Sequence, residues 1–266
     1  RNRMKRILSA EFKRAINIWF ALGIFGVAFS ICFDSWNDLI RHWENNVGTV
    51  HYIFANSAFG GMCREHLLPV FAAFPFAVSF IREKRSKAMP YIVLREGKRT
   101  YCTVKYVVNA VSGGVVIALG TALVLLLLIK FPMADSDYLD ARIADAFHDW
   151  LVVHHPVQYC AVQIFLGFFR GMLWSGAALL VSVYIEDVFV VIVSPYVGSF
   201  VFTQLNRLLQ IDNAYRLDNI LTGRSVIHSS WSTVIIAFIC TMLIVFVMGM
   251  IFVRKIVRGL GNGTIH

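Results

Sequence analysis

Charged residues are scarce in this chain. Only 15% of its 266 residues are Asp, Glu, Lys or Arg, against about a quarter in a typical soluble domain, whereas 58% are hydrophobic. A water-soluble fold needs a polar shell, but the few charges here lie in short clusters between long apolar runs. The composition therefore argues against a soluble protein and predicts one that folds within a lipid bilayer.

Motifs for catalysis and metal binding are also absent from the sequence. The five cysteines form no CxxC pair, and there is no HExxH, no GxSxG and no GxxxxGK[ST] phosphate loop. One cluster of acids and imidazoles has the chemistry of zinc ligands but fits no established spacing: Asp145, His148, Asp149, His154 and His155. We therefore expect no catalytic residue, no metal and no cofactor in this chain.

Six apolar runs are candidates for membrane-spanning helices. A bilayer core of roughly 30 Å takes about 20 helical residues, and backbone groups in lipid must pair within their own segment. No regular ten-residue alternation suggests a barrel. The second run contains Pro69 and Pro75, so a kink is expected there. The six predicted spans are 15–33, 66–81, 106–129, 156–185, 188–205 and 231–253.

The distribution of charge predicts the orientation. With the N-terminus inside, the inner segments hold most of the Lys and Arg, whereas the outer segments hold most of the Asp and Glu. Both termini are therefore predicted to be cytoplasmic. The net charge of +9 is explained by this topology, and basic residues split around apolar spans without interleaved aromatics argue against a nucleic-acid partner.

Residues 1–14 have the pattern of an amphipathic helix. Apolar and basic residues recur on largely opposite faces. We predict an interfacial helix on the inner membrane surface, with its basic face toward anionic headgroups. A simple charged anchor for the first span remains the alternative. The apolar positions are Met4, Ile7, Leu8, Phe12 and Ala15, and the polar positions are Arg3, Arg6, Ser9, Lys13 and Arg14.

The inner segment 82–105 is densely charged and lies between the second and third spans. It is long enough for a short helix and a turn, and a soluble partner could dock on it. The alternative is an ordinary positively charged cytoplasmic loop.

This layout resembles that of the permease subunits of ABC-2 type exporters. The resemblance covers an amphipathic N-terminal helix, six spans, a short inner turn at Glu186 and Asp187, and an outer segment 206–230 suited to re-entrant or surface helices. The closest matching positions are Glu83, Lys84 and Arg85 after the second span, then Arg95, Glu96, Gly97 and Arg99 in the turn, and Lys105 at the third span. The chain departs from the family at Ser86 and Lys87, where many members have Gly-Thr.

The resemblance implies a motor-driven exporter in which this chain, as a single transmembrane domain of residues 1–266, is not itself an enzyme. A cytoplasmic ABC ATPase would bind ATP and Mg, and a second permease copy or a homologous permease would complete the pathway in a bacterial inner or plasma membrane. We expect an amphipathic peptide or hydrophobic small molecule as substrate. The residues implied in ATPase coupling are Arg82, Glu83, Lys84, Arg85, Met89, Arg95, Glu96, Gly97 and Arg99.

Four residues within the spans are further candidates. Arg170 lies inside the fourth span, where a charge generally faces protein or water, so it would line a pathway, pair with a partner subunit or bind a carbonyl. Gly167 and Gly171 have the spacing of a close helix interface, and Phe74 belongs to a Phe-rich face that could receive an apolar substrate or simply pack.

The alternative function is an ion-coupled secondary transporter or an intramembrane enzyme that acts without an ATPase. Those classes predict internal repeats and intramembrane carboxylates, and neither is evident in the sequence.

Overall fold

The protein is described by a computed structural model covering residues 2–36, 39–40, 63–86, 89–128, 155–212, 215–222, 227 and 229–261. Within these ranges the chain is helical, with turns and one isolated β-bridge between Ile227 and Ser229. Four of the candidate zinc ligands lie outside the described residues: Asp145, His148, Asp149 and His154. Lys87 of the inner segment also lies outside them.

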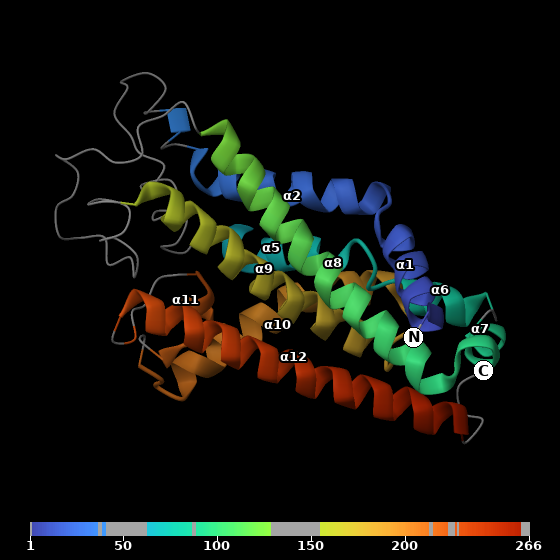
Figure 1. Cartoon of the computed structure of the whole chain (residues 1–266). Coiled ribbons are helices and arrows are strands. Elements are labelled where there is room, and N and C mark those ends of the chain that lie inside the picture. Colours follow the sequence, from blue (N-terminus) through green and yellow to red (C-terminus); the bar gives the residue numbers. More distant parts are fainter. Residues whose placement is uncertain are drawn as a thin grey trace.

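The long helices run lengthwise in a bundle (Figure 1). One end of the bundle carries α1, α6, α7 and the C-terminal end of α12, and the other end carries α11. The helices are α1 (Asn2–Ala15), α2 (Ile18–Asp34), the π-helix η1 (Cys63–Leu67), α5 (Leu68–Ala73), α6 (Ser79–Arg85), α7 (Met89–Glu96), α8 (Lys98–Leu127), α9 (Pro156–Val181), α10 (Val188–Leu208), α11 (Leu217–Thr222) and α12 (Ser230–Gly261).

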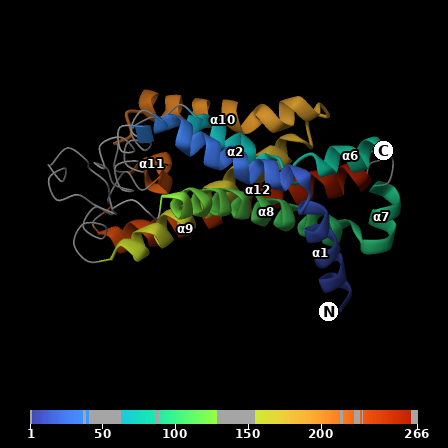
Figure 2. The ribbon, with the colours of Figure 1, turned by 90° about the horizontal axis from the view of Figure 1, so that it is seen from above.

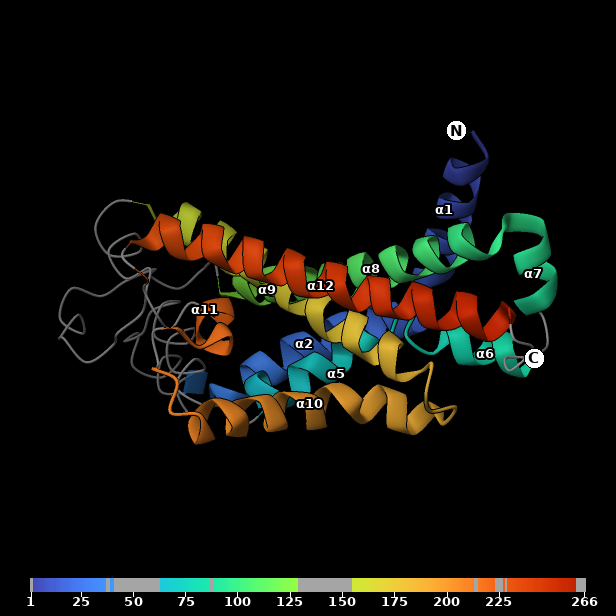
Figure 3. The ribbon, with the colours of Figure 1, turned by 90° about the horizontal axis from the view of Figure 1, so that it is seen from below.

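Four helices in the described ranges are long and apolar enough to cross a membrane. They are α8, α10 and nearly all of α9 and α12. The bent pair α1 and α2 is a fifth candidate if the two helices form one span. The expectation of a helical fold with several helices able to cross a membrane is therefore confirmed for the described residues. Seen from above and below, α10 lies on the opposite side of the bundle from α8 and α12, with α5 between them (Figures 2 and 3).

The second predicted span, 66–81, is broken in the structure. It consists of η1, α5, a turn over residues 74–78 and α6. Pro69 stands in the first turn of α5, where its missing N–H costs nothing, but Pro75 falls in the turn, where a proline interrupts a helix. The expected kink is thus a complete interruption, and this segment is not among the four long helices.

The first predicted span begins later than expected, because α1 and α2 meet at a bend of 59°. Asn17 fixes this bend. Its side-chain oxygen accepts hydrogen bonds from the N–H groups of Trp19 (2.8 Å) and Phe20 (3.2 Å), which caps α2. Its amide group donates to the carbonyls of Arg14 (2.9 Å) and Pro75 (3.2 Å), so the bend is tied to the broken second segment.

The centre of the bundle is a close crossing of α8 and α9. A Cβ atom added at Gly171 would stand 2.3 Å from the carbonyl oxygen of Gly113, so the two backbones touch at this point. One turn further on, the amide of Asn109 donates to the carbonyl of Ser175 at 2.6 Å. Such contacts between small residues are the usual way in which helices associate within lipid.

Candidate functional site

Charged side chains from three separate parts of the chain meet at the end of the bundle that carries α6 and α7. Figure 2 shows α1 projecting from the bundle at this end. We call Glu11, Arg14, Glu83, Tyr101 and Lys105 the charged cluster. Its members come from α1, α6 and the first turns of α8.

Lys105 is the centre of the charged cluster. It is only 1% exposed, and its ammonium lies 2.6 Å from Glu83 Oε1 and 3.7 Å from Glu11 Oε2. The rings of Phe76 and Tyr101 lie 4.9 and 5.5 Å from the ammonium, close enough for cation–π attraction. A buried ammonium is costly unless it is paired, so these contacts explain how the side chain is accommodated.

Glu83 connects the other members of the cluster. Its Oε1 also contacts the guanidinium of Arg14 at 3.3 Å, and its Oε2 accepts a hydrogen bond from the Tyr101 hydroxyl at 2.5 Å. Arg14 pairs with Glu11 as well, at 2.9 Å. Two carboxylates thus face two cations, and the balance of charge fixes α6 to both α1 and α8.

The two residues after Glu83 bind a different partner. Lys84 forms an ion pair with the carboxylate of Glu186, and Arg85 donates to the carbonyl of Glu186 at 2.6 Å. The hydrogen bond from Lys84 holds the pKa of Glu186 below its ordinary value. Asp187 then caps α10 by accepting from the N–H of Val190 at 3.0 Å. Three consecutive residues of α6 therefore reach α1, α8 and the turn between α9 and α10.

The next helix, α7, has one buried and one exposed face. Met89 and Val93 pack in the main hydrophobic cluster, whereas Tyr91 is 76% and Leu94 is 84% exposed. Gly97 joins α7 to α8 with a φ of 89°, a left-handed conformation that favours glycine, and its N–H closes α7 by donating to the carbonyl of Val93 at 2.8 Å. This turn presents the exposed face of α7 at the end of the bundle (Figure 3).

The predicted coupling residues separate into groups in the structure. Glu83, Lys84 and Arg85 make the contacts described above, and Met89 is buried. Arg95 and Glu96 pair with each other on α7 at 2.9 Å, whereas Arg82 is exposed and lines a small cavity beside the bend at Asn17. Residues 98–105 belong to the first turns of α8, and Arg99 lies along a groove between α8 and α12.

Sequence reasoning missed Glu11, Tyr101 and Glu186 as partners of Glu83 and its neighbours. The signal that points to Glu11 is that it is the only acidic residue before Asp34, on a helix otherwise rich in Lys and Arg. Anionic headgroups do not bind a carboxylate. A lone acid on a basic amphipathic helix is therefore suited to pair with an internal cation.

The residues singled out within the spans lie in contacts between helices. The Arg170 guanidinium donates to the carbonyls of Arg64 and Glu65, both at 2.9 Å, and the side chain is 8% exposed. Phe74 packs edge-on against Trp19 and Phe71. Gly167 approaches Ile117, and Gly171 approaches Gly113. Arg170 thus ties α9 to the π-helix that opens the broken second segment.

Replacing Arg170 by glutamine should lower the free energy of unfolding by about 2–3 kcal/mol, because hydrogen bonds from a buried cation to two carbonyls are lost. Thermal unfolding in detergent would measure this loss. Arg207→Gln, which removes an exposed arginine of α10, is the matched control and should change stability by less than about 0.5 kcal/mol. Equal melting curves for the two variants would contradict a structural role for the Arg170 contacts.

Metal binding finds no support in the described ranges, where no three His, Cys, Asp or Glu side chains are grouped as ligands would be.

Comparison with known proteins gives no match: no family model, curated protein or solved structure corresponds to this chain. Function is therefore inferred from the charged cluster, the exposed face of α7 and the apolar helices.

Proposed function

We propose that this chain is the transmembrane subunit of an ABC-2 type exporter, spanning the membrane six times with both termini in the cytoplasm and driven by a separate ABC ATPase. The observation that carries the proposal is the position of Glu83. From α6, the short helix that ends the broken second segment, Glu83 binds α1 through Arg14 and α8 through Lys105 and Tyr101.

These contacts tie α6 to α1 and α8, and we infer that α6 and α7 act as a lever. A push on α7 would reach α8 through Gly97. A push on α6 would reach α1 and α8 through the charged cluster, and the turn between α9 and α10 through Lys84 and Arg85. Separating the buried Lys105–Glu83 ion pair would leave charges unpaired, so this contact resists displacement. A motor docked on this segment would therefore move several membrane helices together.

The exposed face of α7 is suited to bind the motor. Tyr91 and Leu94 offer apolar surface beside Arg95, and aromatic and arginine side chains are enriched at protein interfaces. The chain has no phosphate loop of its own, so ATP and Mg would be bound by the partner ATPase.

The remaining parts of the proposal concern the pathway. A second copy of the chain, or a homologous permease, would enclose it in the cell membrane, and an amphipathic peptide or hydrophobic small molecule is the proposed substrate. None of α8, α9, α10 and α12 contains Asp or Glu. Ion-coupled transporters commonly place carboxylates within their spans, so this composition favours a separate motor over ion coupling.

The double variant Tyr91→Ala/Leu94→Ala tests the docking surface. Purified from the native host membrane, the unaltered chain should carry an ABC ATPase, identified by mass spectrometry through its phosphate-loop peptide. The variant should retain at most about a tenth as much ATPase, because truncating side chains at the centre of an interface costs about 2 kcal/mol or more where they are hot spots.

A matched control removes equally exposed apolar side chains from the opposite end of the bundle. Leu208→Ala/Leu209→Ala should leave the amount of ATPase unchanged, since these residues lie at the end of α10 away from α7. Transport by the purified chain in liposomes with no ATPase present would overturn the proposal in favour of a secondary transporter.

A further inference from the structure

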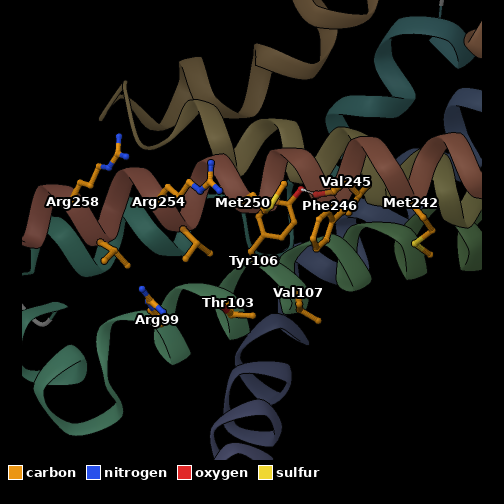
Figure 4. Close-up of a pocket in the computed structure, with 13 residues that line it drawn as sticks. Arg99, Thr103, Tyr106, Val107, Met242, Val245, Phe246, Met250, Arg254 and Arg258 are labelled. Carbon is orange, nitrogen blue, oxygen red and sulfur yellow. Dashed lines mark hydrogen bonds between the residues drawn. The ribbon is translucent and has the colours of Figure 1, made fainter.

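A groove of about 990 Å³ runs between α8 and α12 (Figure 4). Tyr106 and Val107 of α8 and Phe246 and Met250 of α12 line its apolar stretch. Tyr106 forms part of its floor, since the hydroxyl donates to the carbonyl of Val245 at 2.8 Å. Val107 and Phe246 are exposed, so the groove opens to the surroundings of the bundle.

The apolar stretch has the depth of one membrane leaflet. From Met242 to Val253 α12 rises about 17 Å at 1.5 Å per residue, and half of a roughly 30 Å hydrocarbon core is about 15 Å. An acyl chain that lies along the groove would therefore be in contact with protein from near the middle of the bilayer to its surface.

Three arginines stand at one end of the groove. Arg254 and Arg258 lie four residues apart on one face of α12, and Arg99 comes from the first turn of α8 (Figure 4). All three are exposed, and no Asp or Glu of the described ranges lines the groove. Within the described ranges none of the three forms an ion pair, whereas Arg14, Lys84 and Lys105 at the same end of the bundle are all paired.

We propose that this groove binds an anionic phospholipid of the inner leaflet. One acyl chain lies along Tyr106, Phe246 and Met250. The phosphate lies beside Arg99, and the exposed side chains of Arg254 and Arg258, on the flank of α12, turn toward it to donate hydrogen bonds. Basic pockets between membrane helices on the cytoplasmic side are suited to anionic headgroups, and guanidinium matches the geometry of phosphate. The assignment to the inner leaflet follows from the charge distribution and does not depend on an ATPase partner.

A second copy of the chain is a poorer occupant of the same groove. A two-fold axis along the membrane normal would bring the arginines of both copies to the same depth, and the described residues that line the groove include no carboxylate to pair with them. The unpaired cations therefore favour a ligand that brings its own negative charge.

Native mass spectrometry of the full chain, released from bilayers that contain equal phosphatidylglycerol and phosphatidylcholine, tests the proposal. The unaltered chain should retain phosphatidylglycerol in preference. Arg99→Gln/Arg254→Gln/Arg258→Gln should lower this preference about tenfold or more, because each basic side chain near the membrane surface strengthens anionic-lipid binding several-fold. Arg207→Gln/Lys255→Gln removes two exposed cations outside the groove and should keep the preference.

A second variant tests the apolar part of the groove. Val107→Trp fills it from a position that is already exposed, leaves all three arginines in place, and should also lower the retention of phosphatidylglycerol. Three outcomes would overturn the proposal: unchanged lipid preference in both variants, equal loss in the Arg207/Lys255 control, or a dimer that becomes monomeric in the arginine variant with lipid retention unaffected. Thermal stabilisation by inorganic phosphate equal to that by phosphatidylglycerol would also overturn it, because it would indicate a site for free phosphate.

Discussion

Replacing Lys105 by methionine should lower the free energy of unfolding by about 3–5 kcal/mol, a large share of the stability of most folded domains. The substitution keeps the apolar stem but leaves Glu83 and Glu11 without the cation that lies 2.6 and 3.7 Å from them. Both carboxylates are largely buried, so neither is well solvated in the variant. Thermal unfolding of the purified chain in detergent would measure the loss.

A triple variant distinguishes the effect of the Lys105 charge on stability from the effect of its packing. Adding Glu83→Gln and Glu11→Gln to Lys105→Met removes the excess negative charge that Arg14 alone does not balance, and should restore most of the lost stability, since replacing buried charges is far less costly than leaving them without a partner. Lys13→Met removes an exposed lysine of α1 and should be close to neutral. If Lys105→Met melts like Lys13→Met, the charged cluster does not stabilise the fold.

The long helices could be predicted from the sequence because their apolar runs are uninterrupted. The predicted spans 156–185 and 188–205 correspond to α9 and α10 with differences of a few residues at their ends, and the span 231–253 lies within α12, which continues to Gly261. The start of α8 was set too late. Lys98 and Arg99 are good helix formers, so charge alone does not distinguish a loop from the first turns of a helix.

The charged cluster could be predicted only in part. Glu83 was identified as important, but its partners Arg14 and Tyr101 are separated from it by 69 and 18 residues in the sequence. Such pairing arises from tertiary packing and leaves no periodic pattern. Lys105 likewise has the position of an ordinary positively charged residue at the inner end of a span, and only the fold shows that it is buried.

Replacing Gly171 by valine is the second change for which we expect a large effect. The new Cβ would stand 2.3 Å from the carbonyl oxygen of Gly113 and 2.7 Å from the Cα atom of Gly114. Both are backbone atoms, so no side-chain rotation relieves the overlap, and α8 and α9 must move apart. Overpacking of this kind costs about 1–3 kcal/mol, and loss of the neighbouring Asn109–Ser175 hydrogen bond adds about 1 kcal/mol.

The expected loss of about 3 kcal/mol would be measured by thermal unfolding in detergent, with Gly167→Ala as the matched control on the same helix. A Cβ at Gly167 meets the Ile117 side chain at 3.2 Å, which can adjust, so this variant should lie within about 1 kcal/mol of the unaltered chain. Gly171→Ala should show most of the effect of valine because the overlap involves the Cβ atom itself. If Gly171→Ala were as stable as Gly167→Ala, the close crossing of α8 and α9 would be wrong, and with it the framework that holds Lys105 in register with Glu83.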